Sequence, residues 1–154
     1  MELYLVRHAH AVDEEENPRR PLSDRGRLQV RALAKFLASS GAFHPAECWH
    51  SSLVRSRETA MLLTKALELP AKLVEVDGLE PCDEPMLIAR QLKGLTEPLA
   101  IVGHEPHLSA LASLLVGGKP EAPIFLLRKS AVIALEGSGH RWQARWQLSP
   151  ELLA

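Results

Sequence analysis

The chain has 154 residues with a formal net charge of −1, and 46% of its residues are hydrophobic while 24% are charged. This balance is typical of one soluble globular domain and gives no support for nucleic-acid binding or for a basic membrane-binding surface. No apolar run approaches the roughly 18 residues of a membrane span, and the N-terminus lacks the pattern of a secretion signal. We therefore expect a single domain over residues 1–154 in the cytoplasm, with Cys48 and Cys82 as reduced thiols.

Strand and helix patterns alternate along most of the chain. The apolar run at residues 3–6 predicts a buried first strand, and Ser23 is a suitable N-cap for a helix over about residues 24–39. Further strands are predicted near 47–49, 72–76 and 99–102, with helices from Leu53 to before Pro70, over about 84–93 and over 107–116.

The tail adds two segments, 130–136 and 141–148, around Gly137-Ser138-Gly139. Their alternation predicts a hairpin with Trp142 and Trp146 on one face. The whole pattern predicts a three-layer α/β/α domain. Its sheet is mostly parallel and covered by helices on both faces, and the tail adds at least one antiparallel strand.

Two of the predicted strands end in a histidine, His8 after the first and His104 after residues 99–102. Because parallel strands open their C-terminal ends onto one crevice, we expect both imidazoles to meet there. Arg55 falls in the first turn of the helix that follows the second strand, where a helix N-terminus and a guanidinium both favour an anion. Arg7 supplies a second guanidinium.

Two imidazoles and two guanidiniums without a nearby acidic cluster favour a phosphoryl group over a divalent metal. One neutral imidazole can attack phosphorus while the remaining groups stabilise the transferring oxygens. These residue types therefore predict a phosphoryl-transfer site that implies no metal and no organic cofactor.

Four blocks of the sequence resemble, in order, those of the histidine phosphatase (phosphoglycerate mutase-like) superfamily. The blocks are Leu5-Val6-Arg7-His8, Leu22-Ser23-Asp24-Arg25-Gly26 with Gln29, residues 51–60, and Gly103-His104-Glu105-Pro106. The short length, Arg20-Pro21-Leu22-Ser23, Leu79-Glu80-Pro81-Cys82 and the Trp-Gln-Leu-Ser-Pro tail are similar to the SixA-type branch of phosphohistidine phosphatases.

This resemblance implies a phosphoglycerate mutase-like fold and a metal-independent hydrolase. His8 would be the phosphorylated nucleophile, and Arg7, Arg55 and His104 would form the phosphate pocket. The implied partner is a phosphorylated protein, such as a histidine phosphotransfer domain, or a small phosphorylated metabolite, and a monomer is the default state. Ala9 replaces the usual glycine after the histidine, which matters only if that position needs a positive φ.

Several roles stay open. Arg20 either reaches phosphate or caps its loop, and Ser52, like Ser51, either caps a helix or touches phosphate. Candidates for a general acid are Glu80, Asp83 and Glu84, unless none of them is used. His50 and His107 are expected beside the site.

The need of the leaving group for a proton helps to predict the class of substrate. Phosphohistidine releases an imidazole whose conjugate acid has a pKa of about 6.5, so a P–N substrate needs less protonation than an alkoxide does. Residues 77–85 also lack a lid-sized insertion, which suits a phosphorylated side chain on another protein.

Three alternatives compete with this hypothesis. The first is a small-molecule phosphomonoesterase of the same superfamily, in which one of the acids protonates an alcohol. The second is a non-catalytic phosphoprotein-binding module, which the intact set of histidines and arginines disfavours. The third is a metal site at His8-Ala9-His10, as in barrel hydrolases. Those barrels need about 250 residues, and Arg7 would repel a cation.

Overall fold

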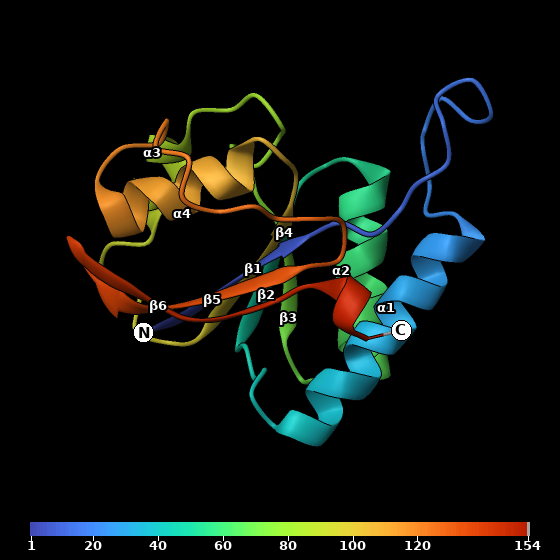
Figure 1. Ribbon diagram of the computed structural model, residues 1–154, viewed down its shortest axis with the longest axis horizontal. Helices are drawn as coiled ribbons and strands as arrows, with labels where there is room; N and C mark the ends of the chain where they lie inside the picture. The colour runs from blue at the N-terminus through green and yellow to red at the C-terminus, as the bar shows by residue number, and fades with distance from the viewer. Residues whose placement is uncertain (154) are drawn as a thin grey trace.

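A six-stranded sheet in the order β3-β2-β4-β1-β5-β6 runs through the middle of the molecule (Figure 1). The structure is a computed structural model that describes residues 1–153. The parallel strands are β1 (Glu2–Arg7), β2 (Glu47–His50), β3 (Lys72–Glu75) and β4 (Leu99–Gly103). Strand β5 (Val132–Ser138) pairs antiparallel with β1, and β6 (Arg141–Leu148) pairs antiparallel with β5.

Helices cover both faces of this sheet, which confirms the predicted three-layer α/β architecture (Figure 1). Helices α1 (Asp24–Ser40) and α2 (Val54–Ala66) bury Val30, Leu33 and Leu63 against one face. Helices α3 (Pro85–Gln91) and α4 (His107–Gly117) bury Ile88, Leu108 and Leu111 against the other, and a short 3-10 helix, η1 (Pro150–Leu152), follows β6. Within residues 1–153, no helix combines the length and the apolar character that crossing a membrane requires.

The start of α1 is fixed by two local contacts. Ser23 is the N-cap as predicted, since its Oγ accepts the Gly26 N–H at 3.0 Å. A Cβ at Gly26 would lie 2.0 Å from the carbonyl oxygen of His10, so only glycine lets the helix approach the backbone that follows β1. The first turn of α1 therefore packs directly beside the end of the central strand.

The strand register brings the two predicted histidines to the same level. Arg7 pairs with Gly103 at the ends of β1 and β4, and the N–H of His8 donates to the Gly103 oxygen at 3.0 Å. His8 and His104 each follow directly on these paired ends. The expectation that both would lie at one edge of the sheet is confirmed.

One prediction about element geometry is wrong. Trp142 and Trp146 lie on opposite faces of the sheet, because a bulge after Ala134 shifts the pairing with β6 by one residue. Helix α2 ends at Ala66, before Pro70 as predicted, and Glu68 then takes a φ of +51°.

Candidate active site

His8 presents one free ring nitrogen in a buried setting. Its side chain is buried and its Nδ1 lies 2.7 Å from the Ala9 oxygen. A carbonyl oxygen can only accept, so Nδ1 carries the proton and Nε2 keeps its lone pair. Burial lowers the pKa of His8 to about 4 against the raising effect of the Ala9 hydrogen bond, and the charges of Arg55 and Arg7 lower it further. His8 is therefore a neutral imidazole at neutral pH.

His104 lies against His8 from the end of β4. The two ring centroids are 5.1 Å apart, with the ring planes inclined by 53°. Burial lowers the pKa of His104 to about 3, and repulsion from His8 and Arg55 adds to this effect. His104 is therefore also neutral in the free protein.

Ser51 orients His104. The Ser51 Oγ lies 2.7 Å from His104 Nε2 and accepts the Leu53 N–H at 3.2 Å. The hydroxyl hydrogen can donate to Nε2, and in that arrangement the imidazole proton lies on Nδ1. Ser51 thus bonds the backbone just before α2 and holds the ring of His104 in place.

Three buried donors around His8 have no partner within residues 1–153. They are Arg7 Nε, Arg55 Nε and His104 Nδ1. Buried donors in native proteins are nearly always satisfied, so this cluster needs an acceptor that the chain itself does not provide. A tetrahedral oxyanion has several oxygens that can accept from such donors at once. The predicted residues are brought together in an arrangement suited to a phosphoryl group.

Two elements position the guanidiniums. Arg7 ends β1 and donates from Nη1 to the Leu127 oxygen at 3.0 Å. Arg55 lies in the first turn of α2, where the helix N-terminus also favours negative charge. Burial lowers the pKa of both side chains, and the charge of Arg20 adds to the effect on Arg55.

The Arg20 side chain holds its own loop. Arg20 adopts a φ of +49°, and its Nε donates to the Val12 oxygen at 3.0 Å. Its charge adds to the lowering of the pKa of Arg55. The hydrogen bond to Val12 supports the interpretation that Arg20 caps its loop, and contact with phosphate stays a prediction.

Ala9 is accommodated without strain at the position where a glycine is usual. Its φ is negative, unlike that of Arg20, and its side chain is fully buried. The Ala9 N–H donates to Thr59 Oγ1 at 3.1 Å, which holds the His8–Ala9 peptide in place.

Two of the three candidate acids gather near Ser52. Ser52 Oγ donates to Glu80 Oε1 at 3.3 Å, and Asp83 accepts the Glu80 N–H at 2.8 Å. These three residues line a small cavity of about 230 Å³. Glu84 is outside this group, because it precedes α3 as an exposed residue without a side-chain capping bond.

Other histidines lie around the site in supporting positions. His50 Nδ1 contacts the Ser51 oxygen at 2.9 Å, and His10 Nδ1 lies 2.6 Å from Ser23 Oγ. His107 is buried at the start of α4 with neither ring nitrogen partnered among the described residues. Residues 1–153 hold no group of three or more His, Cys, Asp or Glu placed to bind a metal ion.

Sequence reasoning missed the segment that precedes β5. The Ser130 N–H donates to both the Arg7 and His8 oxygens, at 3.0 and 3.2 Å, from a buried residue with a φ of +61°. The charge of Lys129 helps to lower the pKa of His8. The residues before an antiparallel strand beside β1 must lie where β1 ends, so finding them required knowledge that β5 pairs with β1.

The fold is an α/β domain whose candidate site is built on paired histidines at one edge of the sheet. A family model described as "Histidine phosphatase superfamily (branch 1)" matches residues 3–80, and the chain belongs to that superfamily. The superfamily resemblance of the sequence and its expected fold are thereby confirmed.

Individual proteins are similar to the chain over nearly its whole length. The chain is 26% identical to phosphohistidine phosphatase SixA of Escherichia coli (strain K12), over 97% of this chain and 94% of SixA. The structure of the protein histidine phosphatase SixA complexed with tungstate superposes with a TM-score of 0.87 at 24% identity, over all of both chains. Alpha-ribazole phosphatase from Shigella flexneri gives a TM-score of 0.78 at 19% identity, over 97% of each chain. The chain is thus a SixA-like phosphatase of this superfamily.

Proposed function

We propose that the protein hydrolyses phosphohistidine on a protein substrate through a covalent phosphohistidine intermediate at His8, without a metal ion. The observation that carries the proposal is the neutral His8, whose free Nε2 lies among the unpartnered donors of Arg7, Arg55 and His104. Its nearest support among known proteins is the similarity to SixA, a phosphohistidine phosphatase.

In the first step, the Nε2 lone pair of His8 attacks phosphorus and the P–N bond of the substrate breaks. The bonding electrons stay on the leaving nitrogen. When the other nitrogen of the substrate ring carries a proton, the imidazole departs neutral and needs no separate acid. Arg7, Arg55 and the Nδ1–H of His104 stabilise the charge on the transferring oxygens.

In the second step, water attacks phosphorus and the bond to His8 Nε2 breaks. The Ala9 oxygen keeps the Nδ1 proton in place on the phosphorylated ring, so His8 leaves as a neutral imidazole. Inorganic phosphate retains the protons of the water molecule. One hydrogen bond thus activates His8 in the first step and makes it a good leaving group in the second.

A small-molecule phosphomonoesterase is the second candidate. The positions of Glu80 and Asp83 beside Ser52 favour it, because an alcohol leaving group needs an acid. The structural similarity to alpha-ribazole phosphatase also supports this candidate function. A phosphoprotein-binding module without activity is the third, and it predicts no turnover at all.

Comparison of P–N and P–O substrates separates these candidates. We expect kcat/KM on a phosphohistidine protein to exceed that on phosphomonoesters, and Glu80→Gln and Asp83→Asn to leave the P–N activity within about threefold. Glu84→Gln is the matched control, since Glu84 lies outside the cavity. Efficient hydrolysis of phosphomonoesters that collapses in Asp83→Asn or Glu80→Gln would instead favour the second candidate.

The remaining expectations are proposals as well. We infer a monomer working in the cytoplasm, and the free thiols of Cys48 and Cys82 agree with a reducing compartment. Activity that persists after chelator treatment is the expected result for a site that uses only the side chains of this chain.

A further inference from the structure

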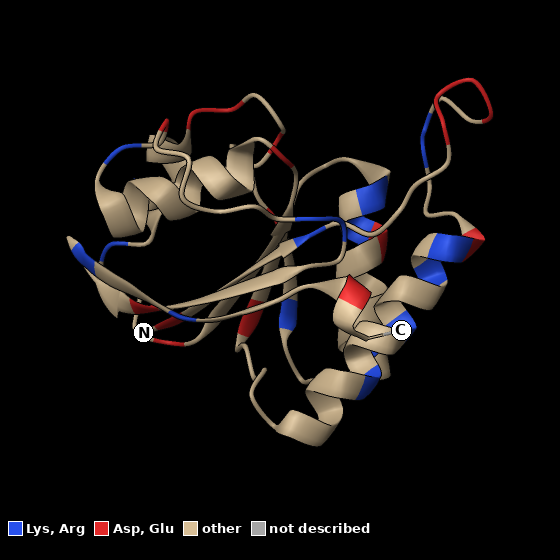
Figure 2. Cartoon of the chain, in the orientation of Figure 1, with Lys and Arg blue, Asp and Glu red and all other residues tan. Residues whose placement is uncertain are grey.

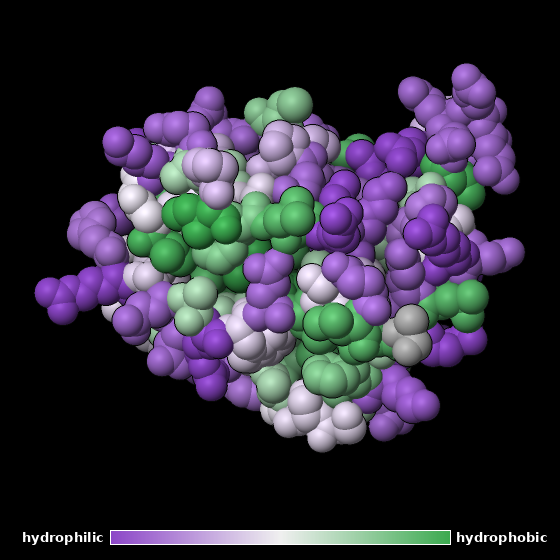
Figure 3. Space-filling model, viewed as in Figure 1, coloured by the Kyte–Doolittle hydropathy of each residue, from purple (hydrophilic) through white to green (hydrophobic). Residues whose placement is uncertain are grey.

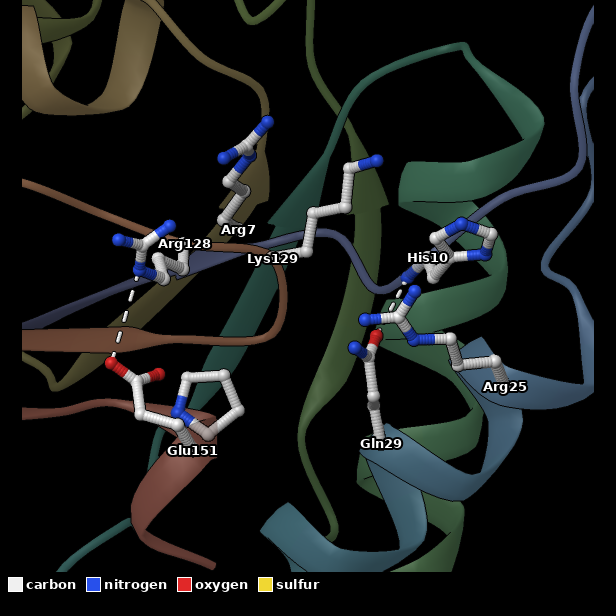
Figure 4. Close-up of a pocket in the computed structure, with 8 residues that line it drawn as sticks. Arg7, His10, Arg25, Gln29, Arg128, Lys129 and Glu151 are labelled. Carbon is white, nitrogen blue, oxygen red and sulfur yellow. Dashed lines mark hydrogen bonds and ion pairs between the residues drawn. The ribbon is translucent and has the colours of Figure 1, made fainter.

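A wide groove opens beside the candidate pocket and shares Arg7 with it. Its volume is about 790 Å³. Figure 4 shows that its side chains come from the end of β1 and the residues just after it, the start of α1, the segment before β5, and η1. We call it the basic groove, after its four cationic residues Arg7, Arg25, Arg128 and Lys129.

The positive charge of the basic groove is largely unbalanced. Glu151 is its only carboxylate, and it lies 3.8 Å from Arg128 Nε in a pair whose side chains are both more than half exposed. Such exposed ion pairs contribute little free energy, so Glu151 compensates the charge of Arg128 only weakly. Within residues 1–153, neither Arg25 nor Lys129 has a carboxylate at ion-pair distance.

This charge is local, since the chain as a whole carries a formal net charge of −1. The acidic run at residues 14–16 sits on a loop that projects away from the body of the molecule (Figure 2). Hydrophilic side chains cover the surface where the segment before β5 faces the start of α1 (Figure 3). Burial lowers the pKa of Lys129, and the neighbouring charges of Arg7, Arg20 and Arg25 lower it further against the raising effect of Asp13.

We propose that the basic groove binds acidic side chains that flank the phosphorylated residue of a protein substrate. The inference rests on the proposed function and deepens it. Arg7 belongs to both the pocket and the groove, so a chain that presents its phosphoryl group to His8 continues directly over Lys129, Arg25 and Arg128.

The exposure of the groove favours a tethered ligand. Arg25 and Arg128 are exposed, so a free small anion would stay largely hydrated and gain little from either of them. A carboxylate held next to a docked phosphohistidine has a high effective concentration, and its pairing adds directly to kcat/KM. Positive charge around the entrance also speeds the encounter with an acidic partner.

Three synthetic phosphohistidine peptides test this proposal. They are phosphorylated with phosphoramidate and differ only in three flanking residues, which are Glu, Gln or Lys. We expect kcat/KM to fall from the Glu to the Gln to the Lys peptide, by about two- to fivefold for each engaged charge pair. This difference should shrink as salt is raised.

Charge reversal in the groove provides the decisive comparison. Arg25→Glu and Arg128→Glu should erase or invert the preference for Glu flanks. Arg27→Glu is the matched control, because Arg27 is an exposed residue of α1 that does not line the groove. Hydrolysis of phosphoramidate, measured for each variant, should change by less than about twofold and reports an intact fold and pocket.

Each other outcome has a defined meaning. If wild type hydrolyses the three peptides equally well, or Arg27→Glu acts like Arg25→Glu, the groove proposal is overturned while the proposed function stands. Groove-dependent hydrolysis of a small dianionic phosphoester, without any effect of flanking charge, would make the groove a small-molecule subsite and also overturn the proposal. If phosphoramidate is hydrolysed but no phosphohistidine peptide or protein is, the proposed function itself is contradicted.

Discussion

Thr59 joins the backbone of Ala9 to helix α2. Its Oγ1 accepts the Ala9 N–H at 3.1 Å and donates to the Arg55 oxygen at 2.8 Å. The His8–Ala9 peptide and the helical turn that carries Arg55 therefore share one buried hydroxyl. Such a link fixes the two sides of the candidate pocket relative to each other.

Replacement of this hydroxyl tests the link. Thr59→Val keeps the shape but leaves the buried Ala9 N–H without a partner, which should cost about 1–3 kcal/mol of unfolding free energy. We expect kcat to fall by about tenfold with a smaller change in KM, because the misplaced His8 acts in the chemical step. Thr59→Ser should restore both quantities, and a Thr59→Val enzyme of full activity would contradict a positioning role.

Ser51 and Ser52 form a natural pair for mutagenesis. Ser51→Ala removes the partner of His104 Nε2 and frees that ring to change tautomer, so kcat should fall by about 10- to 100-fold. Ser52→Ala should change kcat by less than about threefold, because Ser52 is exposed and its side chain makes only a long hydrogen bond to Glu80 among residues 1–153. Steady-state kinetics on one substrate gives both values. Equal losses in the two variants would refute the assigned role of Ser51.

Oxyanion binding should depend on the unpartnered donors. Tungstate or inorganic phosphate should raise the Tm of the wild type, because an anion that binds only the folded state stabilises it. Arg7→Lys and Arg55→Lys should weaken this stabilisation strongly, since an ammonium lacks the forked donor geometry. Arg20→Lys should have a smaller effect, because the Arg20 Nε is engaged with Val12. Titration calorimetry gives the affinities, and unchanged binding in Arg55→Lys would exclude that residue from the pocket.

The buried histidines should make stability depend on pH. The pKa of His8 is about 4 in the folded protein and near its ordinary 6.5 when unfolded, so the unfolded chain binds more protons between these values. The contribution of His8 to the free energy of unfolding should therefore be fully present above pH 6.5. It should decline toward pH 4, by up to about 3 kcal/mol. His104 should contribute in the same direction, because its pKa is lowered to about 3.

A matched pair of variants isolates this effect. In His8→Asn the decline in Tm between pH 6.5 and pH 4 should be shallower than in wild type. His140→Asn, at an exposed position of the hairpin turn, should keep the wild-type slope. Identical slopes in all three proteins would show that His8 is not held neutral by burial.

The sequence predicted the centre of the candidate site better than its surroundings. His8, His104 and Arg55 were predictable because each follows directly on a strand or opens a helix at the same edge of a parallel sheet. Lys129 and Ser130 were not, since their position depends on β5 pairing antiparallel with β1, which no local pattern in residues 119–131 reveals. The ranking of Glu80 and Asp83 over Glu84 likewise depends on how residues 77–85 turn toward Ser52.

The placement of Trp142 and Trp146 was predicted wrongly for the same reason, since it also depends on how the strands pair. Residues four apart in a regular strand share a face, so Trp142 and Trp146 were expected together. One extra residue in β6 reverses the alternation, and the two indoles pack into different cores. A bulge is set by tertiary packing and leaves no periodic signature in the sequence.

Chemical trapping tests the covalent mechanism most directly. Wild-type protein is mixed with a protein substrate that carries labelled phosphohistidine, and the reaction is quenched within milliseconds under alkaline conditions. We expect labelled phosphate on His8 Nε2 at a level that rises and falls with turnover, and neither label nor turnover in His8→Asn. An active His8→Asn enzyme, or wild-type turnover without any labelled His8, would contradict this mechanism.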